Sequence, residues 1–150
     1  MSRDRNNHTL FKDISFSLLA EGKILKIKAD GYSMHPAIKT GSIIFIEPLA
    51  GNTDPVPGEI IAWKRESGFV VHRLIRILNN GNETLYFTRG DSGTYEDKPV
   101  TRDQIAGKVV KVENKKGRIK VGPQLIRKPY YSINRLTVWA LLKFNRICNL

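Results

Sequence analysis

Residues 58–78 read GEIIAWKRESGFVVHRLIRIL and contain two apolar runs that are rich in β-branched side chains. The first run covers residues 59–64 and the second covers residues 69–78, with Glu66-Ser-Gly68 between them. β-branched residues favour strands, and a short polar stretch with a glycine favours a turn. This segment therefore predicts a β-hairpin.

Further short apolar runs lie on both sides of this hairpin. They cover residues 23–29, 41–47, 84–88, 105–112 and 118–121. Turn-forming stretches separate the later runs, namely Asn79-Asn-Gly-Asn82 and Asn114-Lys-Lys-Gly117. Many short strands joined by turns predict a mainly β fold that is built from antiparallel sheets.

The two ends of the chain have helical rather than strand periodicity. Apolar residues recur at helical spacing from Leu10 to Glu21, and Gly22 follows as a stop. One face of a second helix is formed near the C-terminus by Ile133, Leu136, Ala140, Phe144 and Ile147. We therefore expect an N-terminal helical segment at residues 1–22, a β domain at residues 23–123 and a basic amphipathic tail at residues 124–150.

Length and composition are those of one folded domain. The chain has 150 residues, of which 41% are hydrophobic and 26% are charged, and these fractions are close to those of ordinary globular proteins. Cys148 is the only cysteine, so no disulfide can form within the chain and a cysteine-ligated metal site would lack partners. No metal and no cofactor are predicted.

Positive charge is concentrated near the C-terminus. From Lys111 to Leu150 there are ten Lys and Arg residues and one acid, Glu113, whereas the whole chain has a formal charge of +11. Such a segment can bind nucleic acid, anionic lipid or an acidic protein, or it can be a solvated basic surface. Charge alone does not distinguish these interpretations.

The sequence predicts no membrane-spanning anchor and no secretory signal. The N-terminus is polar, and the longest uninterrupted apolar run, Val138 to Leu142, is far shorter than the roughly 20 residues that a spanning helix needs. We expect a protein that is cytoplasmic or peripheral to the membrane.

Ser33 lies in the cluster Gly31-Tyr-Ser-Met-His-Pro36, between two predicted strands. A serine hydroxyl becomes a nucleophile when a base lies within hydrogen-bond reach and a donor meets the developing oxyanion, which a backbone N–H of the loop can do. The same residue types also form ordinary turns, so this cluster alone does not establish a nucleophile.

His72 lies in the second strand of the hairpin and shares a strand face with Val70 and Leu74, so its imidazole is expected to point toward the apolar side. It can be a hydrogen-bonded core histidine. An imidazole is also suited to take a proton from a serine at physiological pH.

Two aspartates follow in the stretch from Thr88 to Pro99. Asp91 comes directly after Gly90 and has the pattern of a turn former, whereas Asp97 can orient an imidazole and stabilise its protonated form. The residues themselves do not show which of the two acids would orient an imidazole.

The order of these motifs resembles that of the signal peptidase I family and its self-cleaving repressor relatives. Gly-x-Ser-Met-x-Pro comes first, a hairpin with Gly-Glu-Ile-Ile and His-Arg follows, and Gly-Asp then precedes a second Asp. The resemblance covers residues 23–112. It implies a serine peptidase with antiparallel sheets of the signal peptidase and repressor peptidase type.

In the bacterial enzymes and the repressors the base is a lysine, so His72 departs from that branch and resembles the histidine branch of the family. In the histidine branch, the orienting acid lies six residues after the Asp of Gly-Asp. The resemblance therefore implies Ser33 as nucleophile, His72 as general base and Asp97 as orienting acid.

The remaining motif residues are implied to be structural residues near the site. These are Gly31, Met34, Pro36, Gly90 and Asp91. Some bacterial members have a hydroxyl two residues before the nucleophile, where this chain has Gly31. The backbone N–H of Ser33 is therefore expected to form the oxyanion hole.

The resemblance also implies the partner, a polypeptide substrate that lies extended beside the strand leading to Ser33, with small residues before the cut. The alternative is a noncatalytic basic module that binds a membrane surface or nucleic acid through the region from Lys111 onward. Nucleic acid is not favoured, because the aromatic residues of this region have a helical spacing that favours packing or lipid contact.

The apolar face of the C-terminal helix has two interpretations. A helix with basic residues outside its apolar face can lie in the interface of an anionic membrane. The same face can instead pack on the β domain, as in any docked terminal helix.

Overall fold

The computed structural model describes residues 13–148 apart from residues 52, 67 and 127. Within these ranges, seven strands form one sheet, and all paired strands are antiparallel. The strands are β1 (Leu25–Lys28), β2 (Ile43–Glu47), β3 (Ile60–Arg65), β4 (Gly68–Asn79), β5 (Thr84–Arg89), β6 (Ile105–Glu113) and β7 (Ile119–Val121). The predicted mainly β, antiparallel fold is therefore confirmed.

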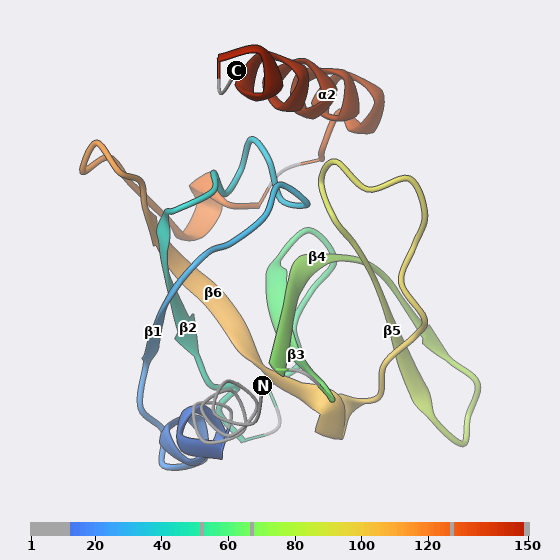
Figure 1. Cartoon of the computed structure of the whole chain (residues 1–150). Helices are drawn as coiled ribbons and strands as arrows, with labels where there is room; N and C mark the ends of the chain where they lie inside the picture. Colours follow the sequence, from blue (N-terminus) through green and yellow to red (C-terminus); the bar gives the residue numbers. More distant parts are fainter. Residues whose placement is uncertain (1–12, 52, 67, 127, 149–150) are drawn as a thin grey trace.

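The hairpin predicted from residues 58–78 is β3 with β4, in a register that places Ile61 opposite His72. The strands lie in the order β1-β2-β6-β3-β4-β5, and β7 pairs with β6 (Figure 1). β6 therefore lies between β2 and β3, although it is far from both in the sequence. Periodicity indicates which residues form strands but not which strands pair, so this insertion was not predicted.

Two apolar clusters cover opposite faces of β3. Ile60 belongs to the larger cluster and the adjacent Ile61 to the smaller one, because successive side chains of a strand point to opposite faces. The larger cluster also includes Met34 from the loop after β1, which is 5% exposed. The core therefore holds the loop that carries Ser33.

The first described residues, 13–20, are helical, and Gly22 follows with a φ of 77°. Leu19 is buried in the larger cluster, and the ring of Phe16 meets the ring of Phe69 edge-on at 4.7 Å between centroids. The predicted N-terminal helix is confirmed over these residues. Its predicted start, at Leu10, lies outside the described residues.

The C-terminal helix, α2 (Tyr131–Cys148), lies across the end of the molecule that carries the loops after β1 and β5 (Figure 1). Its predicted apolar face is in solvent, since Ile133, Leu136 and Phe144 are each 64% exposed. The interpretation that this face packs on the β domain is therefore wrong. In the described part of the chain, no helix combines the length and hydropathy needed to cross a bilayer.

Candidate active site

The loop between β1 and β2 presents Ser33 at the surface. Gly31 has a φ of 84°, a conformation that favours glycine, and its carbonyl accepts a hydrogen bond from the Thr40 hydroxyl. Ser33 is exposed, whereas the next residue, Met34, is inserted in the core. Pro36 follows a cis peptide bond on the exposed side of the loop. The loop is thus anchored by Met34 and leaves the Ser33 side chain free to face a pocket.

A second loop, after β5, forms hydrogen bonds with the backbone of the Ser33 loop. The backbone N–H of Ser92 donates to the Ser33 carbonyl at 2.9 Å. The Ser92 hydroxyl donates to the Tyr32 carbonyl at 2.7 Å and lies 3.0 Å from the Ser33 carbonyl oxygen. Ser92 therefore fixes the backbone on either side of the Tyr32–Ser33 peptide, a role that the sequence analysis missed.

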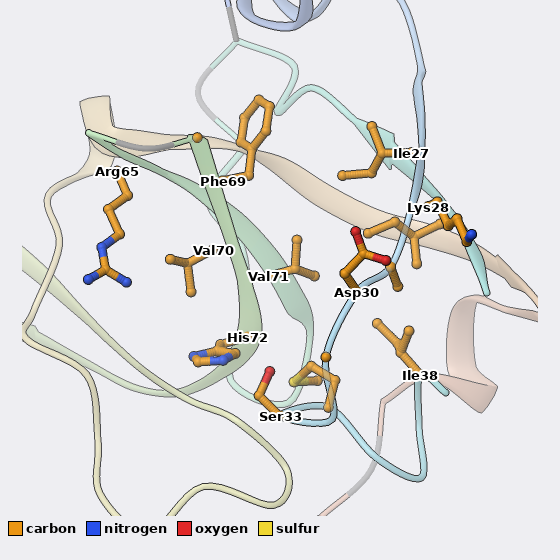
Figure 2. Close-up of a pocket in the computed structure, with 15 residues that line it drawn as sticks. Ile27, Lys28, Asp30, Ser33, Ile38, Arg65, Phe69, Val70, Val71 and His72 are labelled. Atoms are coloured by element: carbon orange, nitrogen blue, oxygen red, sulfur yellow. The ribbon is translucent and has the colours of Figure 1, made fainter. Parts of the chain in front are cut away.

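Gly90 lies at the point where these two loops and β4 meet. A Cβ atom at this position would lie 2.8 Å from the Ser33 carbonyl oxygen, and 3.2 Å from both Ser33 Cβ and His72 Nε2. Only a residue without a side chain fits such a close approach. The same distances show that Ser33 and the Nε2 side of the His72 ring lie next to each other, and Figure 2 shows the Ser33 oxygen directed toward that ring.

The other ring nitrogen of His72 contacts a carboxylate. Nδ1 of His72 lies 2.7 Å from Oδ2 of Asp97, and the Thr88 hydroxyl donates to the same oxygen at 2.7 Å. The indole N–H of Trp63 donates to Thr88 Oγ1 at 3.2 Å. An ionised carboxylate only accepts hydrogen bonds, so in the neutral ring Nδ1 carries the proton and the lone pair is on Nε2, the nitrogen beside Ser33.

The environment of Asp97 keeps its carboxylate ionised. Burial raises the pKa of Asp97, but the hydrogen bonds from His72 and Thr88 and the charges of His72 and Arg65 outweigh burial and lower this pKa below its usual value. An ionised Asp97 can orient the ring and stabilise the positive charge that the ring acquires when it takes a proton.

Asp91 has a different partner. Its two carboxylate oxygens accept bonds of 2.7 Å from Nε and Nη2 of Arg73, and both side chains are almost completely buried. Arg73 also donates to the carbonyls of Gly58 and Leu125, each at 2.6 Å. The Asp91 carboxylate is therefore part of a buried ion pair, and Arg73 connects β4 to three other chain segments. The carboxylate bonded to His72 is that of Asp97.

A pocket of about 500 Å³ leads to Ser33 and His72. One wall is the strand β1 with the residues that follow it, and the other is the tip of the β3–β4 hairpin (Figure 2). Apolar side chains line most of it, namely Ile27, Ala29, Ile38, Phe69 and Val71. Ser33 and His72 lie together at one end of this cavity, so a chain bound along β1 would reach both.

β1 has an unpaired edge along this pocket. Among the described strands it pairs only with β2, through a register from Leu25 opposite Ile46 to Lys28 opposite Ile43. The backbone groups on its other edge can therefore form hydrogen bonds with an extended peptide.

The described residues contain no group of three or more His, Cys, Asp or Glu side chains that could hold a metal ion.

The chain is similar to known peptidases over the region that contains these residues. The family model described as Peptidase S24-like matches residues 5–110. Signal peptidase I W of Bacillus subtilis (strain 168) is 29% identical over 84 residues, which are 55% of this chain and 44% of that relative. The match thus spans less than half the length of that relative. Both findings agree with the resemblance drawn from the motifs.

Proposed function

The chain belongs to the peptidase S24-like family, and from this premise we propose that it is a serine endopeptidase of the signal peptidase I type that cleaves a precursor or leader peptide. The observation that carries the proposal is the position of the His72 imidazole, with Nδ1 on Asp97 and Nε2 beside Ser33. This position supports the proposal, because a serine becomes a nucleophile when a base lies within reach of its hydroxyl.

In the proposed reaction, Ser33 Oγ attacks the scissile carbonyl carbon while His72 Nε2 takes the hydroxyl proton. Asp97 accepts the Nδ1–H bond throughout and stabilises the imidazolium. His72 then gives its proton to the leaving amine as the peptide C–N bond breaks, which leaves an ester on Ser33. Water, deprotonated by the same imidazole, hydrolyses the ester and regenerates the serine.

The developing oxyanion is proposed to bind the backbone N–H of Ser33. Among the described residues, no hydrogen bond is donated by this N–H, so it is available for a ligand. The loop that carries it is restrained by the Ser92 contacts, which supports a donor that is in place before the reaction.

The substrate is proposed to lie extended along the unpaired edge of β1, with small residues just before the scissile bond. Main-chain hydrogen bonds to a strand edge provide affinity that does not depend on sequence. Three buried apolar residues, Met34, Ile38 and Ile44, contribute to the lining of the pocket, and we expect this lining to accept small substrate side chains.

The proposal is tested by cleavage of a peptide library, read by mass spectrometry, with the wild type, Ser33→Ala and Ser17→Ala. Ser17 is an exposed serine of the N-terminal helix, so Ser17→Ala is the same substitution away from the site. We expect wild type and Ser17→Ala to cut the same peptides after small residues, and Ser33→Ala to cut none. A noncatalytic module predicts the same background for all three proteins, and this result would reject the enzyme.

A further inference from the structure

α2 has two distinct sides, and among the described residues only one of these sides contacts the rest of the protein. The less exposed side chains on α2 are Tyr131, Asn134, Arg135 and Val138, which recur at helical spacing on one side. The side chains of Ile133, Leu136, Phe144 and Ile147 are between 63% and 64% exposed. With Ala140, these residues form the outer face of α2, which points away from the β domain.

Two contacts fix the orientation of the helix. The Asn134 side-chain amide is buried and donates to the Asp91 carbonyl at 2.9 Å. The Arg89 guanidinium lies over the Tyr131 ring, 3.6 Å from its centroid. These contacts attach the first turn of α2 to the end of β5 and to the loop that follows it, so rotation of the helix to bury its outer face would break them.

The charges around the outer face are of one sign. After Glu113 the chain has no acidic residue. On α2, Lys143 and Arg146 are exposed, whereas Arg135 lies on the side that contacts the protein and donates to the Gly93 carbonyl at 3.3 Å. Trp139 is 58% exposed at the edge of the outer face, with the Lys143 ammonium 5.0 Å from the centroid of its ring. An apolar stripe with basic residues and an aromatic ring at its border is the pattern of a helix that lies in a membrane interface.

We propose that the outer face of α2 docks this protein on an anionic bilayer surface, with the helix axis parallel to the membrane plane. The apolar stripe would enter the boundary between headgroups and acyl chains, and the basic side chains would meet anionic headgroups. A nucleic acid would bind the cations but leave the apolar stripe exposed to water. A second copy of α2 would bring cations together without any acid on the helix to pair with them.

This docking does not depend on the peptidase activity. If both proposals hold, the contacts of Asn134 and Tyr131 connect the docked helix to the loop that holds Ser33. The pocket would then sit at a constant position relative to the membrane surface, where a membrane-associated precursor can reach it.

The test is sedimentation of the full chain with vesicles of phosphatidylcholine alone or of phosphatidylcholine with phosphatidylglycerol. The test variant is Leu136→Glu with Phe144→Glu. The control is Ile24→Glu with Ile119→Glu, since Ile24 is 53% exposed and Ile119 is 52% exposed, both away from α2. Both double variants remove two exposed apolar side chains and add two negative charges, and only the test variant changes the outer face of α2.

We expect the wild type and the control to pellet with the anionic vesicles only, and salt to weaken this binding. The partition coefficient of Leu136→Glu with Phe144→Glu is expected to fall at least about tenfold, because the stripe can no longer be buried. The Trp139 fluorescence of the wild type is expected to shift to the blue with anionic vesicles, and Trp139→Phe is expected to lose this shift.

Equal partition of both double variants, or no pelleting of the wild type, would overturn the proposal. So would a wild-type dimer in lipid-free solution that the α2 variant converts to a monomer, since a second copy would then cover the face. Circular dichroism is recorded for each variant. An unchanged spectrum shows that the variant is folded, so weaker binding is then due to the changed surface.

Discussion

Asp97 lies 2.7 Å from His72 through one carboxylate oxygen, while Asp91, six residues earlier, is paired with Arg73. Two acids close together in the sequence thus have different surroundings, one partly exposed beside an imidazole and one buried with a guanidinium. We therefore expect Asp97→Asn to lower activity and Asp91→Asn to lower stability.

Asp97→Asn is expected to lower kcat by about 10³- to 10⁴-fold while leaving the protein folded. The amide is neutral, so it does not stabilise the imidazolium, and its NH₂ group favours the tautomer that places the proton on Nε2. Steady-state cleavage of the best library peptide measures this effect. A loss below about tenfold would show that Asp97 does not orient the base.

Asp91→Asn is expected to destabilise the protein by about 3–5 kcal/mol, because it leaves the Arg73 charge buried without its partner. Urea denaturation measures the free energy of unfolding. Arg73→Met in the same chain is expected to recover part of the loss, since it removes the unpaired charge. Unchanged stability of Asp91→Asn would contradict the structural role of this pair.

Gly90→Ala is expected to reduce kcat about 10- to 100-fold, because the new methyl group would push the Ser33 carbonyl away and misplace the nucleophile. The matched control is Gly117→Ala, where φ is 72° and a Cβ atom meets nothing within 4 Å. The control should lower thermal stability through backbone strain and leave kcat unchanged. Full activity of Gly90→Ala would mean that the loops are not held as closely as described.

The lowered pKa of Asp97 makes its contribution to stability depend on pH. A carboxylate whose pKa is lower in the folded than in the unfolded state stabilises the fold above the unfolded value of about 3.9, and this contribution is lost as pH falls through the folded value. The free energy of unfolding of the wild type minus that of Asp97→Asn should therefore be constant near neutral pH and decrease in acid. Urea denaturation across this range measures the difference, and a difference that grows in acid would contradict the direction of the shift.

Much of the fold could be predicted because each strand carries its own signal. The runs that predicted the hairpin match β3 and β4 to within one or two residues, and the turn residues mark where the neighbouring strands end. The position of β6 between β2 and β3 could not be predicted in this way, because strand order depends on the tertiary fold.

Part of the candidate site also lacked a sequence signal. Ser92 and Thr88 look like ordinary loop and strand residues, and their contacts with Tyr32 and Asp97 exist only once the loops meet. Arg73 lies on an apolar strand as an isolated charge, and its partner lies 18 residues away. Residue spacing did not show whether Asp91 or Asp97 contacts His72. Their burial and hydrogen-bond partners in the structure distinguish them.

The proposal that Ser33 is the nucleophile of a peptidase can be tested directly by detection of the covalent intermediate. The wild type is mixed with a peptide that it cleaves, quenched in acid, digested and mapped by mass spectrometry. We expect the N-terminal fragment of the substrate to be found as an ester on Ser33, and Ser33→Ala to carry no adduct and not to cleave. Cleavage by Ser33→Ala at the wild-type rate, or an adduct on another residue, would contradict it.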